Sequence, residues 1–258
     1  ETYIMQPQTI LLAFIFFLYG IVIGSFVNVC IYRIPKKENI AVNRSHCMSC
    51  NHVLAWYDLV PLFSWIFLRG KCRYCGEKIS GQYPLVEFIN GVGYVWIFLV
   101  SGMNVGCILY CLTFSALIAL SVIDWRTYEI PVGINGFILT MGIMATAIDY
   151  KNILNHIIGF VSVSGFLLIL YYATKGRGIG GGDVKLMAVA GLLIGWQKIL
   201  LALVLGAILG SVIHIARMKI SGEEHILAFG PYLSAGIFIA MLYGEQMINW
   251  YLGFFILS

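Results

Sequence analysis

Four cysteines in one polar stretch of the chain have the spacing of a metal site. They form two Cys-x-x-Cys pairs in the sequences HCMSC and KCRYCG, namely Cys47 with Cys50 and Cys72 with Cys75. Each pair can place two thiolates on one tetrahedral ion, and two pairs complete a four-cysteine zinc site. Because four protein ligands leave no open position, we expect the zinc to be structural. Two alternatives stay open: His46 or His52 replaces one thiolate, or the four cysteines are unrelated reduced thiols.

Two aspartates beside apolar segments are candidates for acid–base chemistry. Asp124 lies near the end of one such segment, in ALSVIDWRTYEIP, and Asp183 opens another, in GRGIGGGDVKL. Ionisable residues near membrane depth are functional candidates. Peptide hydrolysis by carboxyl groups needs one ionised group to activate water and one protonated group to protonate the substrate, and two adjacent carboxyls share a proton in this way. The alternatives are that Asp183 only caps a helix and that Asp124 only ends one at the interface.

Helix position suggests how the two carboxyls differ. We expect Asp183 at a helix N-terminus, where the helix dipole favours negative charge, and Asp124 at a C-terminus, where it does not. The hypothesis that follows is an ionised Asp183 and a protonated Asp124 at rest. Gly180 and Gly182, which precede Asp183, give the backbone access to unusual dihedral angles and to a closely approaching substrate strand.

The composition indicates a polytopic, all-α membrane protein. Of 258 residues, 60% are apolar and 11% are charged, whereas soluble domains carry roughly 25% charged residues; the mean hydropathy is +0.89. A membrane-spanning helix needs about 20 apolar residues. We expect about eight spans, at 9–32, 85–101, 104–123, 132–149, 155–173, 184–196, 198–216 and 228–257. The last contains Gly244–Gln246 and is either one span or a broken one.

The distribution of basic residues predicts the orientation in the membrane. If the polar segment after the first span is cytoplasmic, only Lys151 and Lys198 of the 16 lysines and arginines fall on the opposite side. Lysine and arginine are enriched in cytoplasmic loops. We therefore expect the cysteines and both aspartates at the cytoplasmic side of the membrane, with both termini outside.

Three parts follow from this layout. Residues 1–33 are expected to form the first transmembrane helix, 34–84 a cytoplasmic zinc-binding domain, and 85–258 a transmembrane bundle that carries the aspartates. The polar segment is too short for a robust apolar core, so metal binding would supply folding energy. The reducing cytoplasm disfavours disulfides. No internal repeat is visible.

Five motifs, in order along the chain, resemble those of the bacterial type IV prepilin peptidase family. They are GSFVNVCIYRIP (Gly24–Pro35), the cysteine segment Arg44–Glu87, IDWRTYEIP (Ile123–Pro131), the G-x-G-D sequence Gly180–Asp183, and AFGPYLSAG (Ala228–Gly236). Many members have an acidic residue after the proline of the third motif, where this chain has Val132. The resemblance covers nearly the whole chain.

The resemblance implies a membrane-embedded aspartic endopeptidase of the bacterial inner membrane, with Asp124 and Asp183 as catalytic residues. It implies cleavage of prepilins or pseudopilins, from type IV pilus or protein secretion systems, after a glycine on the cytoplasmic face. It also implies methylation of the new N-terminal residue with S-adenosylmethionine as the methyl donor. We find no glycine-rich Rossmann turn, so no donor-binding residue is assigned.

Two alternative functions remain open at this point. One is a leader peptidase without methyltransferase activity. The other is a transporter or scaffold with a zinc-binding loop, although transporters tend to carry their polar groups at mid-membrane. The lipid bilayer is an expected partner and nucleic acid is not. The sequence does not indicate the oligomeric state.

Overall fold

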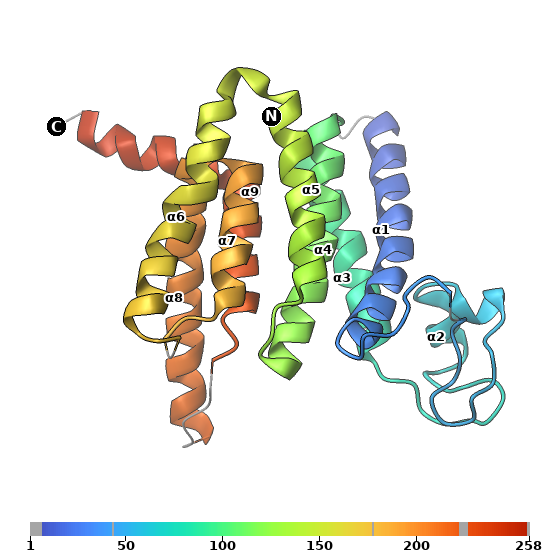
Figure 1. The fold of residues 1–258 in the computed structure, drawn as a ribbon. Coiled ribbons are helices and arrows are strands. Elements are labelled where there is room, and N and C mark those ends of the chain that lie inside the picture. The colour runs from blue at the N-terminus through green and yellow to red at the C-terminus, as the bar shows by residue number, and fades with distance from the viewer. Residues whose placement is uncertain (1–6, 43, 177, 222–226, 257–258) are drawn as a thin grey trace. The chain divides into compact units, whose positions relative to one another are not determined.

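The computed structural model describes residues 7–42, 44–176, 178–221 and 227–256, and its regular structure is helical (Figure 1). The chain divides into two compact units, residues 1–119 and 120–258, and the division falls inside helix α4. The first unit holds α1 (Pro7–Arg33), η1 (Trp56–Leu59), α2 (Phe63–Phe67), α3 (Gln82–Ser101) and most of α4 (Val105–Thr127). The second holds the end of α4, then α5 (Val132–Ile148), η2 (Tyr150–Asn152), α6 (Ile153–Ala173), α7 (Gly181–Ile194), α8 (Trp196–Ser221) and α9 (Gly230–Ile256).

The all-α membrane fold expected from the sequence is confirmed, and the helices α1 and α3 to α9 coincide with the expected apolar segments. Among the described residues, five helices are long and apolar enough to cross a membrane, namely α1, α3, α4, α6 with η2, and α8. Helix α5 is shorter, with 17 residues. Helix α9 is continuous through Gly244–Gln246, and Figure 1 shows a sharp bend towards its C-terminal end. That all eight helices cross the membrane stays a prediction.

In the first unit, α1 and α3 pack against each other in antiparallel directions at very short range. A Cβ atom on Gly20 would lie 2.7 Å from the Cα of Gly91, and one on Gly24 would lie 2.8 Å from the Cα of Glu87. Small residues permit this close approach. In lipid no hydrophobic effect drives helices together, so the van der Waals contacts made at this distance hold α1 and α3 together. Asn90 adds a buried hydrogen bond of 2.7 Å from its Nδ2 to the carbonyl of Gly20.

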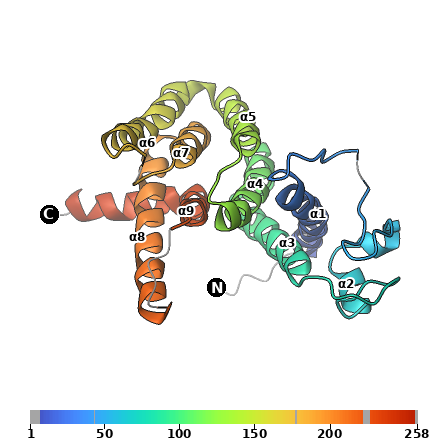
Figure 2. The same cartoon turned by 60° about the horizontal axis from the view of Figure 1, so that its bottom comes forward.

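In the second unit, α7 is the central helix, enclosed by α5, α6, α8 and α9 (Figure 2). Ten of its 14 residues are buried. Its length of about 21 Å is less than the roughly 30 Å of a bilayer core. It meets α6 backbone to backbone, because a Cβ on Gly159 would lie only 2.3 Å from the carbonyl oxygen of Gly191. The C-terminal end of this short helix is buried among its neighbours, where its free backbone groups need partners.

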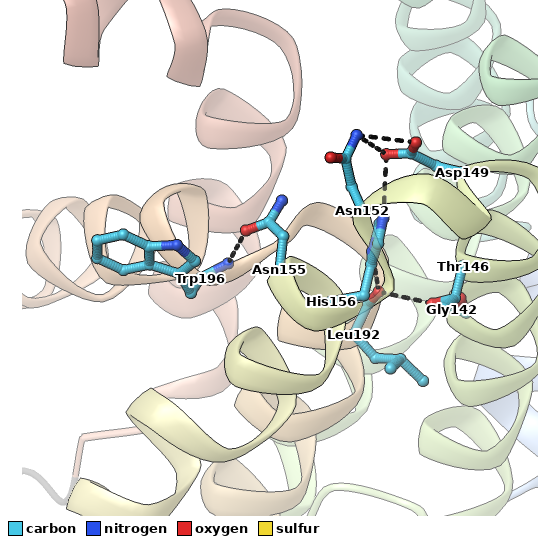
Figure 3. Close-up of polar contacts among 8 residues, drawn as sticks. All are labelled: Gly142, Thr146, Asp149, Asn152, Asn155, His156, Leu192 and Trp196. Atoms are coloured by element: carbon cyan, nitrogen blue, oxygen red, sulfur yellow. Dashed lines mark hydrogen bonds and ion pairs between the residues drawn. The ribbon is translucent and has the colours of Figure 1, made fainter.

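The C-terminal end of α7 finds its partners on α5 and α6 (Figure 3). The N–H of Trp196, which would continue the helical pattern to the carbonyl of Leu192, instead donates to Asn155 Oδ1 at 3.2 Å. The Leu192 carbonyl is left to accept from His156 Nδ1 at 2.8 Å and from the hydroxyl of Thr146 at 3.5 Å. Because a carbonyl oxygen only accepts, Nδ1 of His156 carries the proton in this contact.

A second layer of polar contacts orients His156. Its Nε2 lies 3.4 Å from Asp149 Oδ2, and the side-chain amide of Asn152 donates to both oxygens of Asp149 at 3.0 and 3.1 Å. Figure 3 shows these groups converging on the end of α7 from the turn between α5 and α6. His156 is 6% exposed. The polar side chains of Asp149, His156 and Thr146 therefore fix the end of α7 that lies away from Asp183.

We predict that replacing His156 with phenylalanine destabilises the second unit, because the Leu192 carbonyl loses its shorter hydrogen bond while the ring volume is kept. The loss should be about 1–3 kcal/mol in the free energy of unfolding, measured by denaturant titration in detergent. His214→Phe on α8, at a half-exposed position, is the matched control and should change stability little. Equal stability of His156→Phe and wild type would show that the hydrogen bond from His156 to Leu192 does not stabilise α7.

Candidate active site and metal centre

Asp124 lies in the last turn of α4 and is held by the start of another helix. It is 5% exposed, and its Oδ2 accepts a 2.9 Å hydrogen bond from the N–H of Gly230, the first residue of α9. The first N–H groups of a helix lack partners within it. A Cβ on Gly230 would lie 2.7 Å from the same carboxyl oxygen. Residue 230 must therefore be a glycine for this carboxyl to reach the backbone of α9.

Asp183 lies in the first turn of α7 and is 7% exposed. Its Oδ2 accepts a 3.1 Å hydrogen bond from the N–H of Gly180, the residue that caps the helix. The aspartate is therefore the third residue of the helix and folds back onto the cap, as in a capping box. The alternative that Asp183 has a capping role describes a real contact, and the contact uses only one of its two oxygens.

The fold brings the two carboxyl groups together, although 58 residues separate them in the sequence. Both belong to the second unit, and the charge of Asp124 acts on Asp183. No hydrogen bond between these two described side chains joins them. In each carboxyl, one oxygen is fixed by a backbone N–H.

The expected helix positions are confirmed, with Asp183 in the first turn of α7 and Asp124 in the last turn of α4. The carboxyl of Asp124, however, also faces the N-terminus of α9. Both carboxyls therefore accept an N–H at a helix N-terminus, which favours negative charge on each of them. Helix position does not tell them apart.

The glycines before Asp183 are needed for space. The expectation of unusual dihedral angles is wrong, because none of the three has a positive φ, and Gly180 has φ −74° and ψ 143°. A Cβ on Gly182 would lie 2.8 Å from the Cβ of Ile130, in the loop after Asp124, whereas one on Gly181 would meet Tyr171 only at 3.8 Å. Gly182 thus lets the loop that follows one aspartate pack against the helix that carries the other.

The four cysteines of the two Cys-x-x-Cys pairs converge as expected. Their Sγ atoms all lie within 4.8 Å of one another, and those of Cys47 and Cys75 are 3.8 Å apart. Two sulfurs bound to one tetrahedral zinc at 2.3 Å lie about 3.8 Å apart. The cluster is therefore compatible with a structural zinc site, and all four cysteines are free thiols.

The two pairs lie on turns of the same design. In the first turn the N–H of Cys47 donates to the carbonyl of His52, and in the second that of Cys72 donates to Glu77, at 2.9 and 2.8 Å. The residue after each second cysteine, Asn51 or Gly76, has a positive φ of 56° or 73°. Asn and Gly are the residues that adopt this conformation most readily.

The surroundings of the cluster favour four thiolates over a histidine ligand. The N–H groups of Cys50 and Ser49 lower the pKa of the Cys47 thiol to about 6, which favours the metal-binding thiolate. The His52 ring lies against the ring of Tyr74, with centroids 3.6 Å apart and the planes tilted by 32°, and His46 Nδ1 lies 3.4 Å from the carbonyl of Arg44. Neither histidine belongs to the group of converging ligand atoms.

Fold and site together define a class: a polytopic helical membrane protein with a buried carboxyl pair and a four-cysteine cluster. Two family models match the chain, "Bacterial Peptidase A24 N-terminal domain" over residues 18–101 and "Type IV leader peptidase family" over residues 111–215. The first lies within the first unit, and most of the second lies within the second unit.

Curated relatives agree with these matches over almost the full length. The prepilin leader peptidase/N-methyltransferase of Aeromonas salmonicida (strain A449) is 30% identical, over 92% of this chain and 92% of the relative. Those of Bacillus subtilis (strain 168) and Stutzerimonas stutzeri are 31% and 33% identical, over 92% and 91% of this chain and 97% and 92% of the relatives. No solved structure gives a significant match. The chain belongs to the family of prepilin leader peptidases/N-methyltransferases.

We predict that the purified protein contains about one zinc per chain and that Cys72→Ser loses most of it, because three thiolates leave the tetrahedral site incomplete. Elemental analysis of the protein in lipid measures the metal. Cys30→Ser is the control, because Cys30 lies on α1 outside the cluster and should keep the zinc. Metal-free wild type, or equal zinc in the two variants, would contradict the site.

Proposed function

We propose that this protein is a membrane aspartic endopeptidase that removes the leader of prepilin-like proteins after a glycine, and that it then methylates the new N-terminal residue. The observation that carries the proposal is the buried pair of Asp124 and Asp183 in a chain of this family. Among the groups of the second unit, this pair has the chemistry that peptide hydrolysis needs.

The pair acts with one carboxyl group ionised and the other protonated. The ionised carboxyl takes a proton from water as the water oxygen attacks the scissile carbonyl carbon, and the protonated carboxyl donates its proton to that substrate as the carbon–nitrogen bond breaks. The products are the leader's carboxyl group and a free amine on the mature pilin. The N–H groups of Gly180 and Gly230 hold one oxygen of each aspartate in place, so the other oxygens face the peptide. Gly180 and Gly182 keep the approach to Asp183 free of side chains.

The substrates are proposed to be prepilins or pseudopilins of a pilus or secretion system. Their apolar helix begins just after the cut, so it can lie among the membrane helices while the basic leader stays in water. We place both aspartates and the zinc-binding segment 34–84 at the cytoplasmic side of the inner membrane, with the peptidase bundle in 85–258 and both termini outside. The support for this orientation is the distribution of lysine and arginine.

Two groups are proposed as cofactors. Zinc fits the four thiolates and would join the turns at 47–52 and 72–77 into one folded segment. S-adenosylmethionine would supply an electrophilic methyl group to the free amine. A leader peptidase that does not methylate is the second candidate function, and the mass of the trimmed product distinguishes the two.

We predict that Asp124→Asn and Asp183→Asn each reduce leader cleavage by about 10²- to 10⁴-fold, because neither amide can exchange the proton that the pair needs. Purified wild type and variants in lipid are given a prepilin, and the products are followed by intact mass. Unchanged zinc content and elution volume show that the variants are folded. Full-rate cleavage by either variant would exclude the carboxyl pair as the catalyst, and a wild type that removes no leader would exclude the peptidase function.

We predict a second, graded effect from the glycines before Asp183. Gly182→Ala places a methyl group against Ile130 and should slow cleavage by up to about 100-fold, since small displacements of catalytic groups are costly. Gly181→Ala meets only an ordinary contact and should cleave at close to the wild-type rate. Single-turnover rates at saturating enzyme measure the difference. Two equal rates would mean that the close packing of Gly182 on Ile130 does not position Asp183.

A further inference from the structure

The first unit contains a cavity of about 440 Å³ that the peptidase chemistry does not use. The zinc-binding segment lines one side of it, and the facing surfaces of α1 and α3 line the other. Pockets for small molecules and cofactors have volumes of about 300–1,000 Å³ and carry a few convergent polar groups. Two such groups lie where α1 crosses α3.

Asn28 on α1 lines this cavity and carries an unpaired acceptor. Its side chain is 2% exposed. Its Nδ2 donates to the carbonyls of Tyr83 and Gly24 at 3.0 and 3.4 Å, which fixes the amide plane and leaves Oδ1 without a hydrogen-bond partner. Nearly all buried polar side-chain atoms in folded proteins are hydrogen-bonded. An orphaned oxygen that lines a cavity therefore points to a ligand that donates a hydrogen bond.

Glu87 on α3 adds a buried carboxylate to the same cavity. It is 7% exposed, and its Oε2 accepts a 2.8 Å hydrogen bond from the N–H of Leu62 in the zinc-binding segment. Leu62 is held in a γ-turn, with φ 61° and ψ −53° and a 2.7 Å hydrogen bond from Phe63 N to the carbonyl of Pro61. This turn is rare and strained. Strained backbone persists where the surrounding structure fixes it, often at ligand sites.

An aromatic wall completes the site. The rings of Tyr32 and Tyr83 are stacked with centroids 5.4 Å apart and planes within 5°, and both residues line the cavity. Tyr83 also carries the carbonyl that orients Asn28. The cavity thus combines a flat aromatic face with a carboxylate and an amide oxygen, and Lys36 lies on its lining.

We propose that this cavity binds the methyl donor S-adenosylmethionine, with Glu87 and Asn28 as the acceptors for its cationic and hydroxyl groups and Tyr32 and Tyr83 as the wall for its adenine. The donor carries an ammonium, a sulfonium and two ribose hydroxyls, which suit a buried carboxylate and an orphaned amide oxygen. Its carboxylate suits Lys36. The inference rests on the proposed methyltransferase function and assigns that function to the first unit.

The test compares wild type with Glu87→Gln and Val29→Phe in the full-length protein, reconstituted in lipid. Glutamine keeps an oxygen for the N–H of Leu62 and removes only the charge. Phenylalanine at Val29, which lines the cavity, fills the space without removing a polar partner. Glu245→Gln on an exposed position of α9 is the matched control. Calorimetric titration with S-adenosylmethionine measures binding directly, and leader cleavage and methyl mass are followed in parallel.

We expect both cavity variants to bind the donor about 10- to 100-fold more weakly than wild type. For Glu87→Gln this is the loss expected for one hydrogen bond to a charged group, and for Val29→Phe the added ring occupies space that the donor needs. Methylation should fall with binding, while leader cleavage stays within about twofold. Wild-type affinity in both variants would overturn the inference, as would a wild type that cleaves but binds no donor. Loss of cleavage in the wild type would instead contradict the proposed peptidase function.

Discussion

Helix α7 lies in the middle of the second unit, and hydrogen bonds hold it at both of its ends. At one end the carboxyl of Asp183 accepts the N–H of its own cap. At the other, His156 and Thr146 take the carbonyl that Trp196 leaves free. An unpaired backbone group buried away from water is costly. The same partners that allow this short helix to be buried also fix the height and rotation of Asp183.

Close packing at two glycines positions the second carboxyl, that of Asp124, as well. Gly182 lets the loop after Asp124 pack against the start of α7, and Gly230 lets the start of α9 approach Asp124 itself. In each case a single Cβ would occupy the space. Each carboxyl is therefore held by one backbone N–H, that of Gly180 at the start of α7 or that of Gly230 at the start of α9. This arrangement suits an enzyme that must admit an extended peptide strand beside two buried acids.

The sequence predicted the helices and the cysteine cluster better than the contacts between distant residues. The spacing of Cys47, Cys50, Cys72 and Cys75 was sufficient to predict the cysteine cluster, because a Cys-x-x-Cys turn is local. The lengths of the apolar segments were sufficient to predict the helices. The partner of Asp124 could not be predicted, because Gly230 lies 106 residues away and meets it only through the packing of α9. The role of His156 was missed for the same reason: its partner, Leu192, is an apolar residue that contributes a carbonyl.

The proposed mechanism of peptide hydrolysis depends on one proton being held by the pair of Asp124 and Asp183. Infrared difference spectra of the resting protein in lipid test it most directly, with each Asp→Asn variant subtracted from wild type. This mechanism predicts that one protonated-carboxyl band disappears in both variants, because the proton belongs to the pair and neither carboxyl keeps it alone. A band that disappears in only one variant, or in neither, would contradict a shared proton and with it the proposed mechanism.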